Sequence, residues 1–190
     1  MTRITKPPEE RRQEIIDTAM KVFYEKGYEK TSISDIAREM HVAQGLCYRY
    51  FSSKEELFDT ALDQYATLQV QRLCANMRPD MSLSELAANA PSFLETENDD
   101  SYAEKFYHDS GNTKFHWQLS LKVCEKLQPI VADFLRAAIT RGEIRLADPD
   151  TAASFFVYGQ LGILLDHTRP AQERVMRVRR FLSDVLKNFC

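Results

Sequence analysis

The sequence predicts an all-α fold, in which an N-terminal three-helix unit is joined by one long helix to a C-terminal helical domain. Glycine and proline are scarce, at six and seven of 190 residues. Apolar residues recur every three or four positions along most of the chain, which is the spacing of one helix face. Between residues 31 and 54, two short helical patterns begin at good capping residues, which indicates two short helices joined by a turn.

The first helix is predicted over residues 9–26. It follows two prolines, which favour a helix start, and Gly27 favours its end. Five apolar residues form its predicted buried face: Ile15, Ile16, Ala19, Met20 and Phe23. This face can support the short helices that follow, because isolated helices of under about a dozen residues are only marginally stable.

The short helices lie between two capping signatures. Each signature pairs a serine with an acidic residue three positions later: Ser32 with Asp35, and Ser53 with Glu56. The first predicts the start of a short helix, and the second predicts a longer helix from Lys54. A turn at residues 41–43 separates the first short helix from a second one over residues 44–51. The predicted helix-turn-helix therefore spans about residues 32–51.

The second short helix has the chemistry of a DNA-reading element. Such a helix enters the major groove, where base edges offer donors and acceptors to side chains near its start. There Gln44 can pair with an adenine edge, Gly45 permits close approach, and Leu46 can meet a thymine methyl group. Nearby hydroxyls, cations and helix starts can bind phosphates: Thr31, Ser32, Tyr48, Arg49, Tyr50 and Lys54.

This stretch resembles the helix-turn-helix of the tetracycline-repressor (TetR) family of bacterial transcription regulators. The resemblance is carried by Ile36-Ala37, Val42-Ala43-Gln44-Gly45, Tyr48-Arg49-Tyr50-Phe51 and Ser53-Lys54-Glu55-Glu56-Leu57. It implies a DNA-binding domain over residues 9–69 and a ligand-binding and dimerisation domain over residues 70–190. By resemblance, the DNA contacts fall on Thr31, Ser32, Ser34, Gln44, Gly45, Leu46, Tyr48, Tyr50 and Lys54.

Three residues depart from the family pattern. Leu46 stands where a small polar residue is common, and Cys47 stands where an aliphatic residue is common. We expect Cys47 to pack inward. His41 replaces a frequent turn glycine, so we expect a non-glycine residue at positive φ in this turn.

The charge distribution, the cysteines and the apolar runs indicate the location and the partners of the protein. The net charge is −3, but residues 1–54 carry ten basic against eight acidic side chains, while residues 55–190 carry fifteen against twenty. Four N-terminal cations could form a DNA-binding arm or a solubilising tail: Arg3, Lys6, Arg11 and Arg12. The four scattered cysteines form no C-x-x-C pair, and no apolar run approaches the ~20 residues of a membrane span. We expect a cytoplasmic protein with no membrane partner.

The long helix from Lys54 is predicted to reach about residue 76 and corresponds to the connecting helix of the family. A helical piece over residues 82–95, interrupted at Pro91, precedes an acidic loop and an aromatic-rich segment. By resemblance, this segment forms the wall of a ligand pocket; on spacing alone, ordinary core is the simpler alternative. The predicted pocket residues are Tyr102, Phe106, Tyr107, His108, Phe115 and Trp117.

The C-terminal helices predict a symmetric dimer. A helix over residues 113–140 contains Pro129, and the next, over residues 151–168, is apolar nearly all round. A helix with so little polar surface must be buried on more than one side, and a second copy can supply the second side. The predicted interface residues are Phe155, Tyr158, Gly159, Gly162 and Leu165. A last helix over residues 172–189 closes the chain, and its arginines, Arg174 among them, are expected on a solvated face.

These features predict a ligand-responsive transcription regulator, most simply a repressor. It would bind a palindromic double-stranded DNA operator as a homodimer and be released by a small apolar or aromatic molecule. An activator, or a protein that acts mainly through protein partners, stays open as the alternative. The rival class is a helical enzyme, but the chain has no G-x-S-x-G, no H-E-x-x-H and no phosphate-cradling glycine loop. We expect no catalytic activity, no cofactor and no bound metal.

Overall fold

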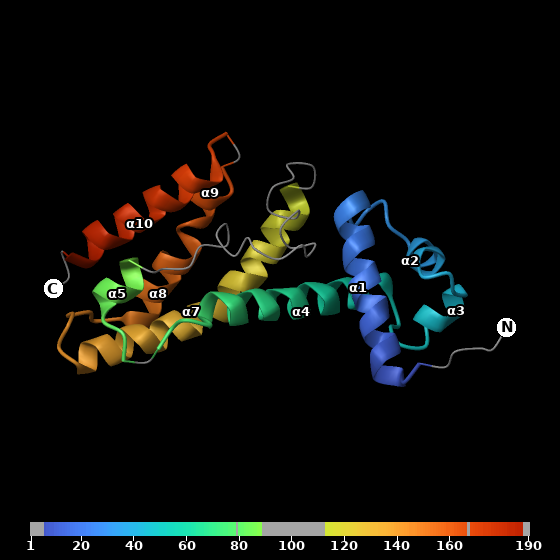
Figure 1. The fold of residues 1–190 in the computed structure, drawn as a ribbon, viewed down its shortest axis with the longest axis horizontal. Helices are drawn as coiled ribbons and strands as arrows, with labels where there is room; N and C mark the ends of the chain where they lie inside the picture. Colours follow the sequence, from blue (N-terminus) through green and yellow to red (C-terminus); the bar gives the residue numbers. More distant parts are fainter. Residues whose placement is uncertain (1–5, 79, 89–112, 167, 188–190) are drawn as a thin grey trace.

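The computed structural model describes residues 6–78, 80–88, 113–166 and 168–187, and all regular structure in these ranges is helical (Figure 1). The predicted all-α fold is therefore confirmed. In chain order the helices are α1 (Pro8–Lys26), α2 (Ile33–Glu39), α3 (Gln44–Cys47), α4 (Lys54–Cys74), α5 (Leu83–Ala88), α7 (Thr113–Thr140), α8 (Pro149–Tyr158), α9 (Leu161–Leu164) and α10 (Ala171–Lys187). None of these helices is both long enough and apolar enough to cross a bilayer.

The molecule is elongated, with a small three-helix unit at one end. We call α1, α2 and α3 the head and the helices from α5 to α10 the body. Figure 1 shows α4 running lengthwise from the head into the body, where α7 crosses it. In the body, α7 packs on α8 as well as on α4. The predicted division at residue 69 falls inside α4 and stays a prediction.

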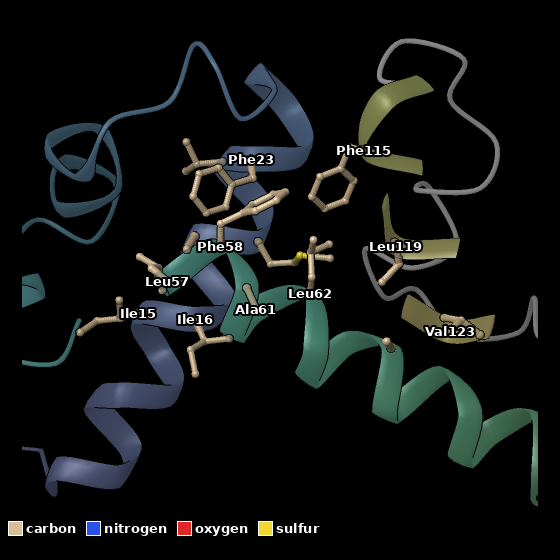
Figure 2. Close-up of a cluster of buried hydrophobic side chains, with 14 of the residues drawn as sticks. Ile15, Ile16, Phe23, Leu57, Phe58, Ala61, Leu62, Phe115, Leu119 and Val123 are labelled. Atoms are coloured by element: carbon tan, nitrogen blue, oxygen red, sulfur yellow. The ribbon is translucent and has the colours of Figure 1, made fainter. Parts of the chain in front are cut away.

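One hydrophobic cluster runs from the head into the body through α4. Figure 2 shows its centre, where α1, α4 and α7 meet. Its labelled members are Ile15, Ile16 and Phe23 from α1, Leu57, Phe58, Ala61 and Leu62 from α4, and Phe115, Leu119 and Val123 from α7. Each large side chain that is fully buried here contributes roughly 1.5–3 kcal/mol. Residues of α1, α4 and α7 therefore pack in one shared cluster.

The helix boundaries predicted for α1 and for α7 agree with the structure. The N–H of Gly27, at φ 81°, donates to the Phe23 carbonyl and ends α1. Helix α7 continues through Pro129 and ends at Gly142, which has φ 76°. The N–H of Gly142 donates to the Ile139 carbonyl, and the N–H of Glu143 donates to the Ala138 carbonyl. The predicted piece over residues 82–95 is seen as α5, and its remainder lies outside the described residues.

The prediction for the second short helix was too long. Helix α3 ends at Cys47 rather than at residue 51. The N–H groups of Arg49 and Tyr50 bond to carbonyls three residues earlier, which makes a tighter turn than an α-helix. This turn brings Phe51 into the core, where it is almost fully buried. Burial of the Phe51 ring therefore accompanies the end of α3.

The single helix predicted over residues 151–168 was also wrong, because it is broken into α8 and α9. The break falls at Gly159 and Gln160. The side-chain amide of Gln160 donates to the Phe156 carbonyl at 2.5 Å, which takes the acceptor that a continuing helix would use. Glycine weakens a helix by roughly 0.5–1 kcal/mol relative to alanine, so the chain turns here easily.

Arg174 does not lie on a solvated face, as the sequence had suggested. Its side chain is only 4% exposed, and Nη1 donates to the carbonyl of Leu164 at the end of α9. Burial lowers the pKa of this guanidinium from its ordinary value. Arg174 therefore connects the start of α10 to the end of α9.

Candidate nucleic-acid interface

Helix α2 begins with a complete capping box, as the sequence predicted. The hydroxyl oxygen of Ser32 accepts from the Asp35 N–H at 3.2 Å, and the Asp35 carboxylate accepts from the Ser32 N–H at 2.9 Å. The Ser32 hydroxyl also donates to this carboxylate at 2.5 Å, and this bond together with that from the Ser32 N–H lowers the pKa of Asp35. The cap fixes the orientation of α2, on which α3 packs.

The turn between α2 and α3 contains the expected non-glycine residue at positive φ. His41 has φ 55°, and its N–H donates to the Arg38 carbonyl at 3.0 Å. The N–H of Val42 donates to the Ala37 carbonyl at 2.9 Å, which completes a Schellman motif. The two hydrogen bonds hold His41 in a conformation that glycine would adopt more easily.

Helix α3 presents its first turn to solvent and its last residue to the core. Gln44 and Gly45 are exposed, Leu46 is half-buried and Cys47 is fully buried. A Cβ placed on Gly45 would meet no atom within 4 Å, so the backbone is open on that side. Burial raises the pKa of the Cys47 thiol, which agrees with the packing role expected for it.

Aromatic and basic side chains follow α3 on the exposed side. The Tyr48 side chain is 49% exposed, and Arg49 is exposed as well. Tyr50 is half-buried and packs against the core cluster. Tyr48 and Arg49 are therefore the freer of these groups to meet a phosphate.

The start of α4 is capped by two consecutive serines. Ser53 accepts from the Glu56 N–H at 3.0 Å, and the Glu56 carboxylate accepts from the Ser52 N–H at 2.7 Å and the Ser52 hydroxyl at 2.6 Å. The bonds from Ser52 lower the pKa of Glu56. Lys54 is the first residue of α4, and its ammonium lies 4.1 Å from the centre of the Tyr28 ring.

One predicted DNA contact points inward. The Thr31 side chain is 3% exposed, and its hydroxyl donates to the carbonyl of Gly27 at 2.8 Å and, at 3.4 Å, to that of Val22. Its hydroxyl ties the loop before α2 to the end of α1 and is not offered to solvent. The other predicted contacts lie at the surface or partly so: Ser32, Ser34, Gln44, Gly45, Leu46, Tyr48, Arg49, Tyr50 and Lys54.

The predicted pocket lies mostly outside the described residues and stays a prediction. Tyr102, Phe106, Tyr107 and His108 lie outside them. Phe115 is buried against the head, with its ring centroid 5.8 Å from that of Phe58, whereas Trp117 is 41% exposed on α7. Phe115 therefore belongs to the core that joins head and body.

Two of the five predicted interface residues, Phe155 and Gly159, line an exposed apolar groove. An open groove of about 490 Å³ runs between α8 and α10. We call it the α8–α10 groove; its lining includes Phe155, Phe156, Gly159, Phe181, Leu182 and Val185. Phe155 is 76% exposed, Tyr158, Gly159 and Gly162 are exposed, and Leu165 is half-buried.

Sequence reasoning missed two contacts near the candidate interface. Arg12 lies over the Phe51 ring, 5.1 Å from its centroid, so it belongs to the folded head rather than to a flexible arm. The contact of Lys54 with Tyr28 joins residues 26 positions apart. No spacing rule within one helix could have indicated either pair, because each depends on how α1 lies against the start of α4.

Comparison with known proteins finds a matching family model and relatives for the N-terminal part of the chain. Residues 15–61 match the family model described as bacterial regulatory proteins, tetR family. The HTH-type transcriptional regulator YuxN of Bacillus subtilis strain 168 is 45% identical over 56 residues, which is 30% of this chain but only 19% of that protein. The chain therefore spans about a fifth of the length of this relative.

Two solved structures share the whole fold. Salmonella enterica GusR superposes with a TM-score of 0.68 at 20% identity, covering 97% of this chain and all of that one. A transcriptional regulator from Saccharomonospora viridis, solved in complex with choline, gives 0.64 at 20% identity, covering 94% of this chain and 96% of the other. At this identity the likeness concerns the fold alone.

Proposed function

Because this chain belongs to the TetR family of bacterial regulatory proteins, we propose that it is a sequence-specific DNA-binding transcriptional regulator. One observation carries the proposal: the first turn of α3 is exposed between two capped helix starts. A short, solvent-facing helix held in this way can enter a major groove while the flanking helix starts approach the backbone.

The side chains of this surface divide into base-reading and phosphate-binding groups. Gln44 supports pairing with an adenine edge, and the open backbone at Gly45 supports close approach to the bases. Phosphate contacts are assigned to the exposed Tyr48 and Arg49 and to Lys54. In this division Gln44 determines sequence preference, and the other side chains determine general affinity and its dependence on salt.

We propose further that two copies bind an inverted repeat. The α8–α10 groove leaves large apolar side chains exposed, and a second copy of the same surface could cover them. A two-fold dimer presents two α3 helices, which suits half-sites about 34–36 Å apart, one turn of the double helix.

Ligand response is the last part of the proposal. The regulator from Saccharomonospora viridis was solved in complex with choline, which supports a small-molecule site in a body of this fold. A ligand that bound one spacing of the two heads more tightly would shift the population away from the DNA-bound form. Release of a repressor is the simplest result, and activation by the ligand is the alternative. A DNA partner also suits a cytoplasmic location.

The test is selection of bound duplexes from a random pool by the full chain, at about 0.15 M salt so that non-specific binding is weak. We expect an inverted repeat to be enriched. The Gln44→Ala variant should alter preference at one position of each half-site, by about 1–3 kcal/mol. The Lys54→Ala variant should weaken binding to all sequences. It should also lower the slope of log affinity against log salt, by about 0.9 for each phosphate that is no longer neutralised.

Each variant serves as a control for the other. A change of preference with Lys54→Ala, or a uniform loss with Gln44→Ala, would contradict the assigned roles. If the unmodified chain enriches no sequence, sequence-specific binding is wrong, and a role through protein partners becomes the better account.

A further inference from the structure

The ammonium of Lys54 is held by a residue of the loop between α1 and α2. Its Nζ donates to the backbone carbonyl of Tyr28 at 3.1 Å and lies 4.1 Å from the centroid of the Tyr28 ring. A lysine ammonium has three N–H donors, and these two contacts leave donor capacity for a phosphate oxygen. Tyr28 thus fixes the direction in which a flexible four-carbon side chain presents its charge.

Tyr28 is in turn held by aromatic rings of the shared core. Its ring centroid lies 4.6 Å from that of Phe58 and 5.8 Å from that of Phe23. Phe58 contacts Phe115, the third residue of α7, at 5.8 Å. Figure 2 shows Phe23, Phe58 and Phe115 side by side, with Phe115 coming from the body.

A second contact holds the same loop to the same turn of α7. Lys114, next to Phe115, forms an ion pair with Glu29, next to Tyr28, at 3.1 Å. A cleft of about 380 Å³ lies between the loop and this turn, and Tyr28 and Phe115 both line it. Since two adjacent residues of α7 contact this part of the molecule, the position of the loop depends on this turn as well as on the direction of α4.

We propose that Tyr28 is a positioning residue for the phosphate contact of Lys54, and that the first turn of α7 holds Tyr28 in place through Phe58 and Phe115. The inference rests on the proposed DNA binding and deepens it. The body can then affect the DNA-contacting surface through the loop between α1 and α2, in addition to any effect of a tilt of α4. A displacement of the start of α7 would therefore weaken the Lys54 contact without altering α3.

The first test measures affinity for the selected duplex with the full chain. Tyr28→Leu removes the ring but keeps the carbonyl, and it should weaken binding about two- to thirtyfold, the range equivalent to a cation–π contact. Tyr28→Phe keeps the ring and should bind like the unmodified chain. In a Lys54→Ala background, Tyr28→Leu should have no further effect, and thermal melting should show that all variants are folded.

Two results would overturn the role of Tyr28. Tighter binding by Tyr28→Leu would mean that the ring withholds Lys54 from DNA. An equal loss with and without Lys54 would mean that Tyr28 supports the head in general. For the body, Phe115→Leu should weaken binding when Lys54 is present but not in a Lys54→Ala background. An equal loss in both backgrounds would contradict the proposed role of α7 in holding Tyr28.

A second test uses the free protein, so that it stands even if no duplex is retained and the proposed function fails. Protons on the Lys54 side chain should show a ring-current shift in the NMR spectra of the unmodified chain and of Tyr28→Phe. The shift should disappear in Tyr28→Leu and decrease in Phe115→Leu. Identical Lys54 resonances in the unmodified chain and Tyr28→Leu would contradict the positioning, whatever the DNA result.

Discussion

Large apolar side chains are buried in the head but exposed along the α8–α10 groove. In the head, Ile15, Phe23 and Phe51 are covered almost completely by other residues of the same chain. Along α8 and α10, Phe155, Met176 and Phe181 are 76%, 63% and 60% exposed. Single exposed apolar residues are normal on a protein surface, but Phe155 and Phe181 line one apolar groove, which indicates a site for a partner.

In the proposed dimer, this difference separates what one chain completes alone from what a second copy would complete. The starts of α2 and α4 are capped within the chain, and the core of the head is closed. The groove has apolar walls and no described segment of the chain over it. We infer that the head folds as part of the single chain, whereas the groove is completed on association.

The largest effect is expected from charges in the groove. Replacing Phe155 and Phe181 together by Glu places two carboxylates where the partner's apolar side chains would lie, and an unpaired buried charge costs several kcal/mol. The variant should be a monomer at concentrations where the unmodified chain is a dimer, as measured by sedimentation equilibrium. Leu121→Glu is the matched control, because Leu121 is also exposed but lies on α7, outside the groove. Dissociation by the control would argue against the groove as the interface.

The second effect concerns the closed core of the head. Phe51→Ala removes a ring that is 1% exposed, and it should lower the free energy of unfolding by about 3–5 kcal/mol. Phe155→Ala removes the same side chain from the groove. Its effect in urea unfolding should grow with protein concentration, since it acts through association. If both variants lost the same free energy of unfolding at every protein concentration, the proposed difference between the two regions would be contradicted.

The third effect concerns the cap of α4. Ser53→Ala should cost about 1 kcal/mol of stability. Glu56 has a folded pKa below its ordinary value of 4.5, so the stability it contributes is present above that pH and is lost as the pH falls through the lowered folded value. Ser52→Ala, which removes one hydrogen bond to that carboxylate, should reduce the loss of stability in urea unfolding between neutral and acidic pH. An unchanged pH dependence would contradict the role of Ser52.

The smallest effect is a gain. His41→Gly relieves a non-glycine residue at φ 55°, which should outweigh the added freedom of the unfolded chain and stabilise the protein by about 0.5–1 kcal/mol. That corresponds to a rise in melting temperature of about 1–4 °C for a chain of this length. His41→Ala keeps the strain and should give no gain. Destabilisation by glycine would mean that the His41 side chain contributes contacts of its own.

Local signals accounted for most of the head. The capping box at Ser32, the cap at Ser53 and the positive φ at His41 each depend on residues within a few positions of one another, and all were predicted correctly. Such signals depend only on residues that are close together in the sequence. They do not determine where a short helix ends, because the end of α3 accompanies the burial of Phe51.

The misplaced side chains all involve contacts between elements. Arg174 was assigned to solvent, but it binds the end of α9, and Thr31 was assigned to DNA, but its hydroxyl binds carbonyls of α1 and the loop that follows it. Arg12 was assigned to an arm or tail, but it lies over the Phe51 ring. In each case the residue type was compatible with both positions, and only the three-dimensional packing distinguishes them.

The most direct test of the account is the mass of the full chain bound to the selected duplex, measured by native mass spectrometry. If the head is complete in one chain and the α8–α10 groove is completed by a second copy, two chains should bind each inverted repeat. At the same concentration, no chain should bind an isolated half-site. The Phe155→Glu, Phe181→Glu variant should lose the two-chain complex. A single chain that bound a half-site as tightly as the whole repeat would contradict the account.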